Sequence, residues 1–146
     1  MENNDGMSIR PAQLSDAACI ARLSGELGYP TSLDAIAQRL SLLPAEFEQV
    51  VVACDDERVI GWMQVGLAMS IESEPFAEIR ALVVDSSVRG QGWGKRLVDA
   101  AMDWSRSHGM ARLRVRSNSL RIATHEFYRR QGFTESKQQK VFALAL

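Results

Sequence analysis

Apolar residues recur at helical spacing in the first third of the chain. Residues 7–10 predict a short strand, and Ile20, Leu23 and Leu27 then predict a helix that Gly28 ends. A second helix is expected before Pro44, opened by Thr31 or Ser32, with an apolar face of Leu33, Ile36, Ala37 and Leu40.

Alternating and continuous apolar segments follow and predict strands. Residues 50–54 and 59–65 flank a polar turn and indicate an antiparallel hairpin. A loop with Glu72 and Glu74 should lead into a strand over residues 76–85. After a glycine-rich turn we expect a helix to about residue 108, a strand over residues 112–116, a helix over about 120–131, and closing strands at 133–134 and 141–146.

This order of elements predicts one α/β domain with a mixed sheet over residues 7–146, preceded by a disordered lead over residues 1–6. The chain has 146 residues, of which 46% are hydrophobic and 24% charged. It is therefore long enough to bury a single core without disulfides or metal. Cys19 and Cys54 lie within apolar patterns without metal-ligand spacing, which favours buried free thiols.

The charge balance argues against some classes of partner. A formal net charge of −1 disfavours proteins that bind nucleic acid through general phosphate attraction. No apolar run approaches the roughly 18 residues of a membrane span, and the polar, acidic N-terminus is unlike a signal peptide. We therefore expect a cytoplasmic protein with neither nucleic-acid nor membrane partners.

The glycine-rich turn carries the strongest chemical signal. Residues 89–95 read Arg-Gly-Gln-Gly-Trp-Gly-Lys between an apolar strand and an amphipathic helix. Glycines leave the backbone N–H groups accessible at the positive end of the helix dipole, which favours a phosphate-bearing ligand. A Walker loop does not fit, because Arg96 follows Lys95. The dinucleotide fingerprint fits weakly, because two helices and a hairpin precede the turn.

The turn resembles the acetyl-CoA loop of the GNAT superfamily of N-acetyltransferases. Arg89, Gly92 and Gly94 match the order of residues in that loop. A second resemblance lies at Phe127-Tyr128, on a helix that ends in Gly132-Phe133. This resemblance implies a GNAT-like, mostly antiparallel mixed sheet with splayed central strands and about four helices, and it implies acetyl-CoA as co-substrate.

The resemblance also implies which residues hold acetyl-CoA. Main-chain groups of Leu82, Val83 and Val84 would pair with the pantetheine arm, and Asn118 would bond to its amides. The pyrophosphate would be held by the N–H groups of Arg89, Gly90, Gln91, Gly92, Trp93, Gly94 and Lys95.

Two residues are candidates for the chemistry of acetyl transfer. By resemblance, Tyr128 would protonate the departing thiolate; the alternative is a tyrosine at the edge of the core. Glu78 is the candidate base, and strand alternation would place it on the same face as Arg80, Leu82 and Val84. The alternatives are a surface glutamate, a glutamate paired with arginine, or an ordered water as base.

Other polar residues have weaker assignments. By resemblance, Glu26 and Tyr29, together with the loop carrying Glu72 and Glu74, rim the acceptor side; the alternative is plain surface. His125 is expected to pack or to form hydrogen bonds, with a role as base as the alternative. Arg112, Arg114 and Arg116 alternate along one predicted strand. We expect them to form a solvated face, to pair with acids, or to contact an acidic substrate or the CoA 3′-phosphate.

The leading prediction is an acetyl-CoA-dependent N-acetyltransferase that transfers the acetyl group directly to a primary amine of a small molecule or peptide. The alternative is a non-catalytic acyl-CoA-binding or sensing module. A homodimer is implied by resemblance only, with the apolar residues 141–146 as a candidate contact.

Overall fold

The computed structural model describes residues 6–146. They form two compact units, of which the first ends at Val115 and the second spans Arg116–Leu146. The predicted disordered lead falls on residues 1–6, of which 1–5 lie outside the described part of the chain. The expectation of a single domain over residues 7–146 stays a prediction.

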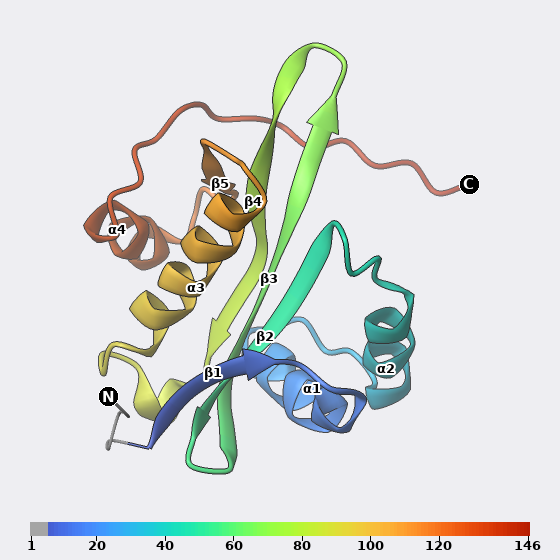
Figure 1. The fold of residues 1–146 in the computed structure, drawn as a ribbon, viewed down its shortest axis with the longest axis vertical. Helices are drawn as coiled ribbons and strands as arrows, with labels where there is room; N and C mark the ends of the chain where they lie inside the picture. The colour runs from blue at the N-terminus through green and yellow to red at the C-terminus, as the bar shows by residue number, and fades with distance from the viewer. Residues whose placement is uncertain (1–5) are drawn as a thin grey trace. The chain divides into compact units, whose positions relative to one another are not determined.

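The strands of the first unit are β1 (Met7–Pro11), β2 (Glu48–Asp55), β3 (Arg58–Ser70), β4 (Ser73–Val84) and β5 (Leu113–Val115). They form one sheet in the order β1-β2-β3-β4-β5 (Figure 1). The first four strands pair antiparallel with their neighbours in sequence, and β5 pairs parallel with β4. The predicted mixed, mostly antiparallel fold is therefore confirmed.

The first unit also contains α1 (Ala17–Glu26), α2 (Leu33–Leu42) and α3 (Trp93–Ser107), with the 3₁₀ turns η1 (Leu14–Asp16) and η2 (Ser86–Val88). The helix ends follow the predicted signals. Ser32 Oγ accepts from the N–H of Ala35 at 3.1 Å, and Gly28 and Gly109 have φ of +90° and +75° after α1 and α3. Within residues 6–146, no helix has the length and hydropathy needed to cross a bilayer.

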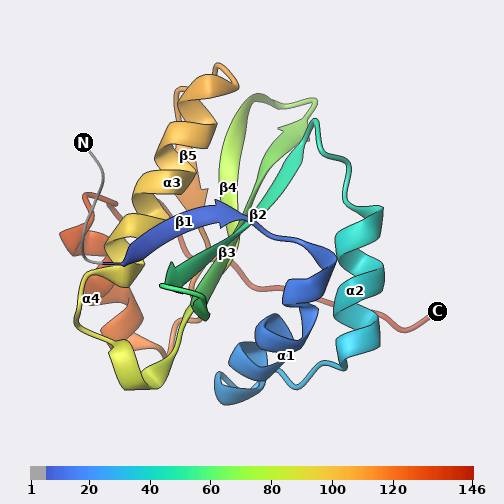
Figure 2. The ribbon, with the colours of Figure 1, turned by 60° about the horizontal axis from the view of Figure 1, so that its bottom comes forward.

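Gly61 and Trp62, neighbours on β3, face opposite sides of the sheet. A Cβ on Gly61 would lie 3.4 Å from Leu97 Cδ1 of α3, whereas Trp62 packs against the apolar cluster that includes Ile20 and Leu23 of α1. Helices α1 and α3 therefore cover opposite faces of the sheet (Figure 2). Burying both faces in this way gives the unit its core.

The predicted loop around Glu72 and Glu74 is mostly strand, so that expectation was wrong. Strands β3 and β4 continue to a tight turn, with Ser70 opposite Ser73. The pairing register shifts between Ala68 and Ser70. Pro75 lies in β4 beside this irregularity, where a proline is tolerated because it interrupts no regular ladder.

Strand alternation in β4 is interrupted at Arg80, which corrects the predicted facing of Glu78. Ile79 pairs with Val65 and Ala81 with Gln64, so Arg80 is an extra residue in the ladder. The register therefore places Glu78 on the same face as Ala81 and Val83. The predicted partners on that face, Leu82 and Val84, lie on the other.

The second unit contains α4 (Ile122–Arg130), slightly shorter than the predicted helix. The closing strands expected at 133–134 and 141–146 are absent, because residues 133–146 carry no strand. A strand requires a partner for its N–H and C=O groups, and an apolar sequence alone does not supply one. Residues 141–146 are exposed instead, with Phe142 at 89%.

Candidate functional site

The turn between β4 and α3 has a backbone conformation that favours glycine. Gly90 and Gly92 have φ of +80° and +90°, in the left-handed region that other residues seldom adopt. A Cβ on either residue would meet no other atom within 4 Å. The backbone angle, rather than a lack of space, therefore requires glycine at both positions. Gly94 is the second residue of α3.

The N-terminus of α3 offers a row of free hydrogen-bond donors. Gly92 is the N-cap and provides no side-chain cap. The N–H groups of residues 92–95 donate to no acceptor in the described chain, and the first bonded N–H is that of Arg96, to Gly92 O at 3.2 Å. Unpaired N–H groups and the helix dipole together favour a bound anion. These residues therefore fit the pyrophosphate predicted for the loop.

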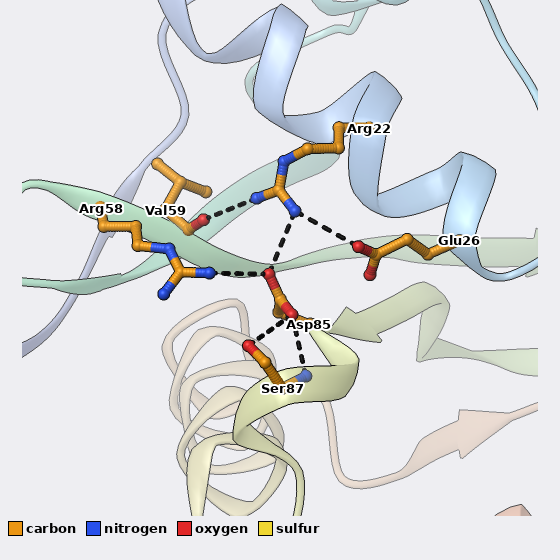
Figure 3. Close-up of polar contacts among 6 residues, drawn as sticks. All are labelled: Arg22, Glu26, Arg58, Val59, Asp85 and Ser87. Carbon is orange, nitrogen blue, oxygen red and sulfur yellow. Dashed lines mark hydrogen bonds and ion pairs between the residues drawn. The ribbon is translucent and has the colours of Figure 1, made fainter.

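Asp85, at the end of β4, anchors the start of this loop (Figure 3). One carboxylate oxygen accepts from Ser87 N–H and Oγ at 2.9 and 2.8 Å. The other accepts from Arg22 Nη1 and Arg58 Nη2 at 3.0 and 3.3 Å. The Ser87 hydrogen bonds, followed by Arg22, lower the pKa of this buried carboxyl from 3.8 to about 2. Asp85 is therefore an ionised anchor.

Strand β4 has an open edge beside the loop. Strand β5 pairs with β4 only from Ala77 to Ile79, because β5 has three residues. On that side, residues 80–84 of β4 have no strand partner within the first unit. An extended ligand can add to such an edge as a further strand. Leu82, Val83 and Val84, predicted to pair with pantetheine, lie on this stretch.

Tyr128 is fixed by the way α4 ends. Gly132, with φ of +98°, follows the helix, and Phe133 N–H donates to Tyr128 O at 3.1 Å. The Tyr128 and Phe133 rings meet edge to face with centroids 5.5 Å apart. This is a Schellman motif with its hydrophobic contact, which explains the Gly-Phe pair after the helix. Burial raises the pKa of Tyr128 to about 12, partly opposed by Arg121.

Comparison with known families is consistent with this geometry. Residues 20–133 match the acetyltransferase (GNAT) family. The chain belongs to this family. The predicted family and the predicted class of enzyme, an N-acetyltransferase, are thereby confirmed.

Relatives of this GNAT protein include enzymes named for aminoglycosides. It is 28% identical to an aminoglycoside N(6′)-acetyltransferase type 1 of Stenotrophomonas maltophilia, over 95% of this chain and 94% of the relative. It superposes on the aminoglycoside 6′-N-acetyltransferase AAC(6′)-Ih of Acinetobacter baumannii with a TM-score of 0.81 and 19% identity, covering 97% and 99% of the two chains. An aminoglycoside acetyltransferase from an uncultured soil sample, in complex with sisomicin, gives 0.78 and 20%, covering 99% of each. These two likenesses establish the shared fold.

Glu78, the candidate base of this GNAT protein, is buried and held by two arginines. Arg80 Nη1 donates to Oε1 at 2.8 Å, and Arg114 Nε donates to Oε2 at 2.7 Å. Arg80 also pairs with Glu48. These contacts match the alternative of an arginine-paired glutamate, and the assignment of Glu78 as base stays a prediction.

Of the arginine row, Arg114 lies within β5, and it matches the predicted alternative of pairing with an acid. Arg114 pairs with Glu78, and the guanidinium carbons of Arg112 and Arg114 lie 4.6 and 4.4 Å from the centroid of the Phe76 ring. Cation–π contacts of this kind hold planar guanidinium groups in place. Arg112 and Arg114 are thus engaged with β4.

The side chains of residues 89–95 differ in whether they are available to the predicted anion site. Trp93 is 3% exposed, so its indole belongs to the core. Lys95 Nζ pairs with Asp99 at 3.0 Å. Arg89 and Gln91 are exposed. Trp93 and Lys95 are therefore engaged within the protein, whereas the Arg89 and Gln91 side chains lie exposed beside the main-chain donors.

The candidate acceptor residues lie at the end of α1. Glu26 Oε1 accepts from Arg22 Nη1 at 3.4 Å, and Tyr29 is 59% exposed just after Gly28. Their contact with an acceptor stays a prediction, as does that of Glu72 and Glu74.

In the second unit, Asn118 forms the turn before α4. Its Oδ1 accepts from Leu120 N–H at 2.9 Å, and its main-chain O accepts from Arg121 N–H and lies 2.8 Å from His125 Nε2. The expected hydrogen-bonding role of His125 is therefore confirmed. The Asn118 amide nitrogen has no partner within the described chain, which suits the predicted contact with pantetheine.

The sequence did not indicate the contacts of Asp85. Arg22 and Arg58 lie 63 and 27 residues from it, and only the fold brings them together. The one local signal was an acidic residue between an apolar strand and a glycine-rich turn.

Proposed function

We propose that this GNAT protein transfers an acetyl group from acetyl-CoA directly to a primary amine of a small molecule or peptide. The observation that carries the proposal is the row of free N–H groups over residues 92–95, next to two glycines in left-handed conformation. Such a row binds a pyrophosphate through donors that need no rearrangement.

The open edge of β4 supports the placement of the thioester. The pantetheine arm would pair with Leu82, Val83 and Val84 as an additional strand, since β5 leaves that edge free. A main-chain N–H of Val83 or Val84 would then polarise the thioester carbonyl. Acetyl-CoA supplies the activated acetyl group for this reaction.

The remaining chemistry requires proton transfer. As the amine nitrogen bonds to the carbonyl carbon, the carbon–sulfur bond breaks, and we assign to Tyr128 the proton that the thiolate receives. An ordered water or Glu78 takes the proton lost by the amine. The positions of the cysteines support direct transfer, since Cys54 is buried in the core and Cys19 lies within α1, away from the turn in sequence.

We assign Glu26 and Tyr29 to the acceptor side. A carboxylate and an exposed phenol suit a cationic, hydroxyl-bearing amine. An aminoglycoside is therefore a good first acceptor to test, because a relative of nearly equal length carries that name. Sisomicin, amino acids and short peptides make a suitable panel.

The test combines acetyl-CoA calorimetry with a thiol-release assay over that panel. We expect saturable binding and amine-dependent release of CoA. Binding without release for any amine would favour the non-catalytic sensing module instead. An absence of binding would contradict both functions.

We further propose a homodimer that uses residues 141–146. Val141, Phe142 and Leu144 are each over 80% exposed there and belong to no strand. Exposed apolar segments of this kind favour association. Sedimentation velocity should show a dimer for the full chain and a monomer for a Phe142→Ser, Leu144→Ser variant. A monomeric full chain would contradict the proposal.

A further inference from the structure

The guanidinium of Arg22 connects parts of the first unit that are distant in sequence. Its Nη1 lies 3.0 Å from Asp85 Oδ2 and 3.4 Å from Glu26 Oε1, and its Nη2 donates to Val59 O at 3.3 Å. Figure 3 shows Arg22 reaching from α1 across β3 to the carboxylate. The Arg22 side chain therefore contacts both Glu26, the candidate acceptor-side residue, and Asp85, which anchors the start of the glycine-rich turn.

The Asp85 carboxylate uses both oxygens in separate directions. One oxygen holds Ser87 in η2, and the other holds the two arginines. The Asp85 side chain is 5% exposed, and a buried carboxylate is costly without charged or hydrogen-bonding partners. A shift of the loop at Ser87 would therefore be transmitted to Arg22 through a single rigid group.

Arg58 provides an internal comparison. It pairs with the same Asp85 oxygen at 3.3 Å, but its side chain is 61% exposed, and within residues 6–146 it forms no hydrogen bond or ion pair with α1. Both arginines compensate the charge of Asp85. Only Arg22 also joins the carboxylate to α1.

We propose that Arg22 is a positioning residue that links the anion-binding loop to the acceptor-side end of α1, so that acetyl-CoA in the loop orders Glu26. The link rests on the proposed function of the loop as the acetyl-CoA site. Arg22 contacts both Asp85 and Glu26, and Asp85 in turn holds Ser87 at the start of the loop.

Hydrogen–deuterium exchange tests this link without an identified acceptor. The ligand-free chain is compared with the chain saturated with acetyl-CoA, in peptides that cover residues 17–29 and 86–95. The variants are Arg22→Met and Arg58→Met, which keep the aliphatic stem and remove the charge. Arg106→Met, at an exposed arginine paired with Asp103 on α3, controls for loss of a surface charge.

In the wild type we expect acetyl-CoA to slow exchange in both peptides. Arg22→Met should keep the slowing over residues 86–95 and lose it over residues 17–29. Arg58→Met and Arg106→Met should keep both. Slowing over residues 17–29 that survives Arg22→Met, or that Arg58→Met abolishes equally, would overturn the proposal.

The ligand-free comparison separates this inference from the proposed function. Without acetyl-CoA, Arg22→Met should speed exchange over residues 86–88 by about tenfold, because the anchor loses a charged hydrogen bond. Unchanged exchange there would overturn the anchoring by Arg22. Loss of acetyl-CoA binding in the wild type would instead contradict the proposed function, and the ligand-free result would still decide the anchoring.

Discussion

Glu78 and Arg114 lie directly opposite each other on β4 and β5, and Arg114 Nε donates to Glu78 Oε2 at 2.7 Å. The strands pair over only three positions, so this contact reinforces a short parallel ladder. Arg80, the extra residue of the β4 bulge, donates to the other oxygen. The bulge thus supplies a second cation to a buried carboxylate.

Replacing Glu78 should affect stability more than proton transfer. Glu78→Gln leaves Arg80 and Arg114 facing a neutral amide, so the free energy of unfolding should fall by about 1–3 kcal/mol. We expect the shape of the pH–rate profile to persist, because both oxygens are occupied by guanidinium donors. The matched control is Glu48→Gln, which removes another partner of Arg80. Loss of the acidic limb in Glu78→Gln alone would establish Glu78 as the base.

The glycine turn permits a matched pair of substitutions at the two ends of α3. Gly92 and Gly109 have φ of +90° and +75°, and each has open space around its Cβ position. Alanine at either should cost about 1–2 kcal/mol of stability. Only Gly92→Ala should weaken acetyl-CoA binding, by about tenfold, because it displaces N–H donors at the anion site. Calorimetry and thermal melts measure both effects. Equal affinities would remove Gly92 from the site.

Local signals in the sequence were sufficient for much of the fold. Ser32 began α2, and Gly28 and Gly109 followed the ends of α1 and α3, where expected, because capping depends on a few adjacent residues. The closely spaced glycines likewise predicted a turn before α3, and the structure shows Gly90 and Gly92 in the left-handed region there. These features need no information from distant parts of the chain.

Features that depend on strand pairing or on long-range contacts were harder to predict from the sequence. The bulge at Arg80 reversed the expected facing of Glu78 relative to Leu82, since register depends on a partner strand. The apolar residues 141–146 have the composition of a strand, but they pair with no strand of the described chain. The Asp85 cluster joins α1, β3 and β4, and its members carry no shared pattern in sequence.

The ionised state of Asp85 predicts a specific response to acid. Its folded pKa of about 2 lies below the ordinary 3.8, so the carboxylate stabilises the fold above about pH 3.8, and this stabilisation is lost as the pH falls through about 2. Asp85→Asn cannot ionise and should be less stable than wild type at neutral pH. The difference should shrink as the pH falls from 4 towards 2, as measured by denaturant unfolding. Asp99→Asn, at a partly exposed helix carboxylate, should show little change at any pH. A constant difference for Asp85→Asn would contradict the assignment.

Tyr128→Phe separates proton donation from binding. The phenol pKa of about 12 keeps Tyr128 protonated at pH 10, where an ordinary phenol would be half ionised. The wild type should therefore keep its donor up to pH 10 and lose it only as the pH rises through about 12. Removing the hydroxyl should lower kcat by about 10²–10⁴-fold. Acetyl-CoA affinity should barely change, since the Schellman motif and the contact with Phe133 do not use the hydroxyl. Thiol release and calorimetry on the same preparations give both values, and unchanged turnover would remove Tyr128 from the donor role.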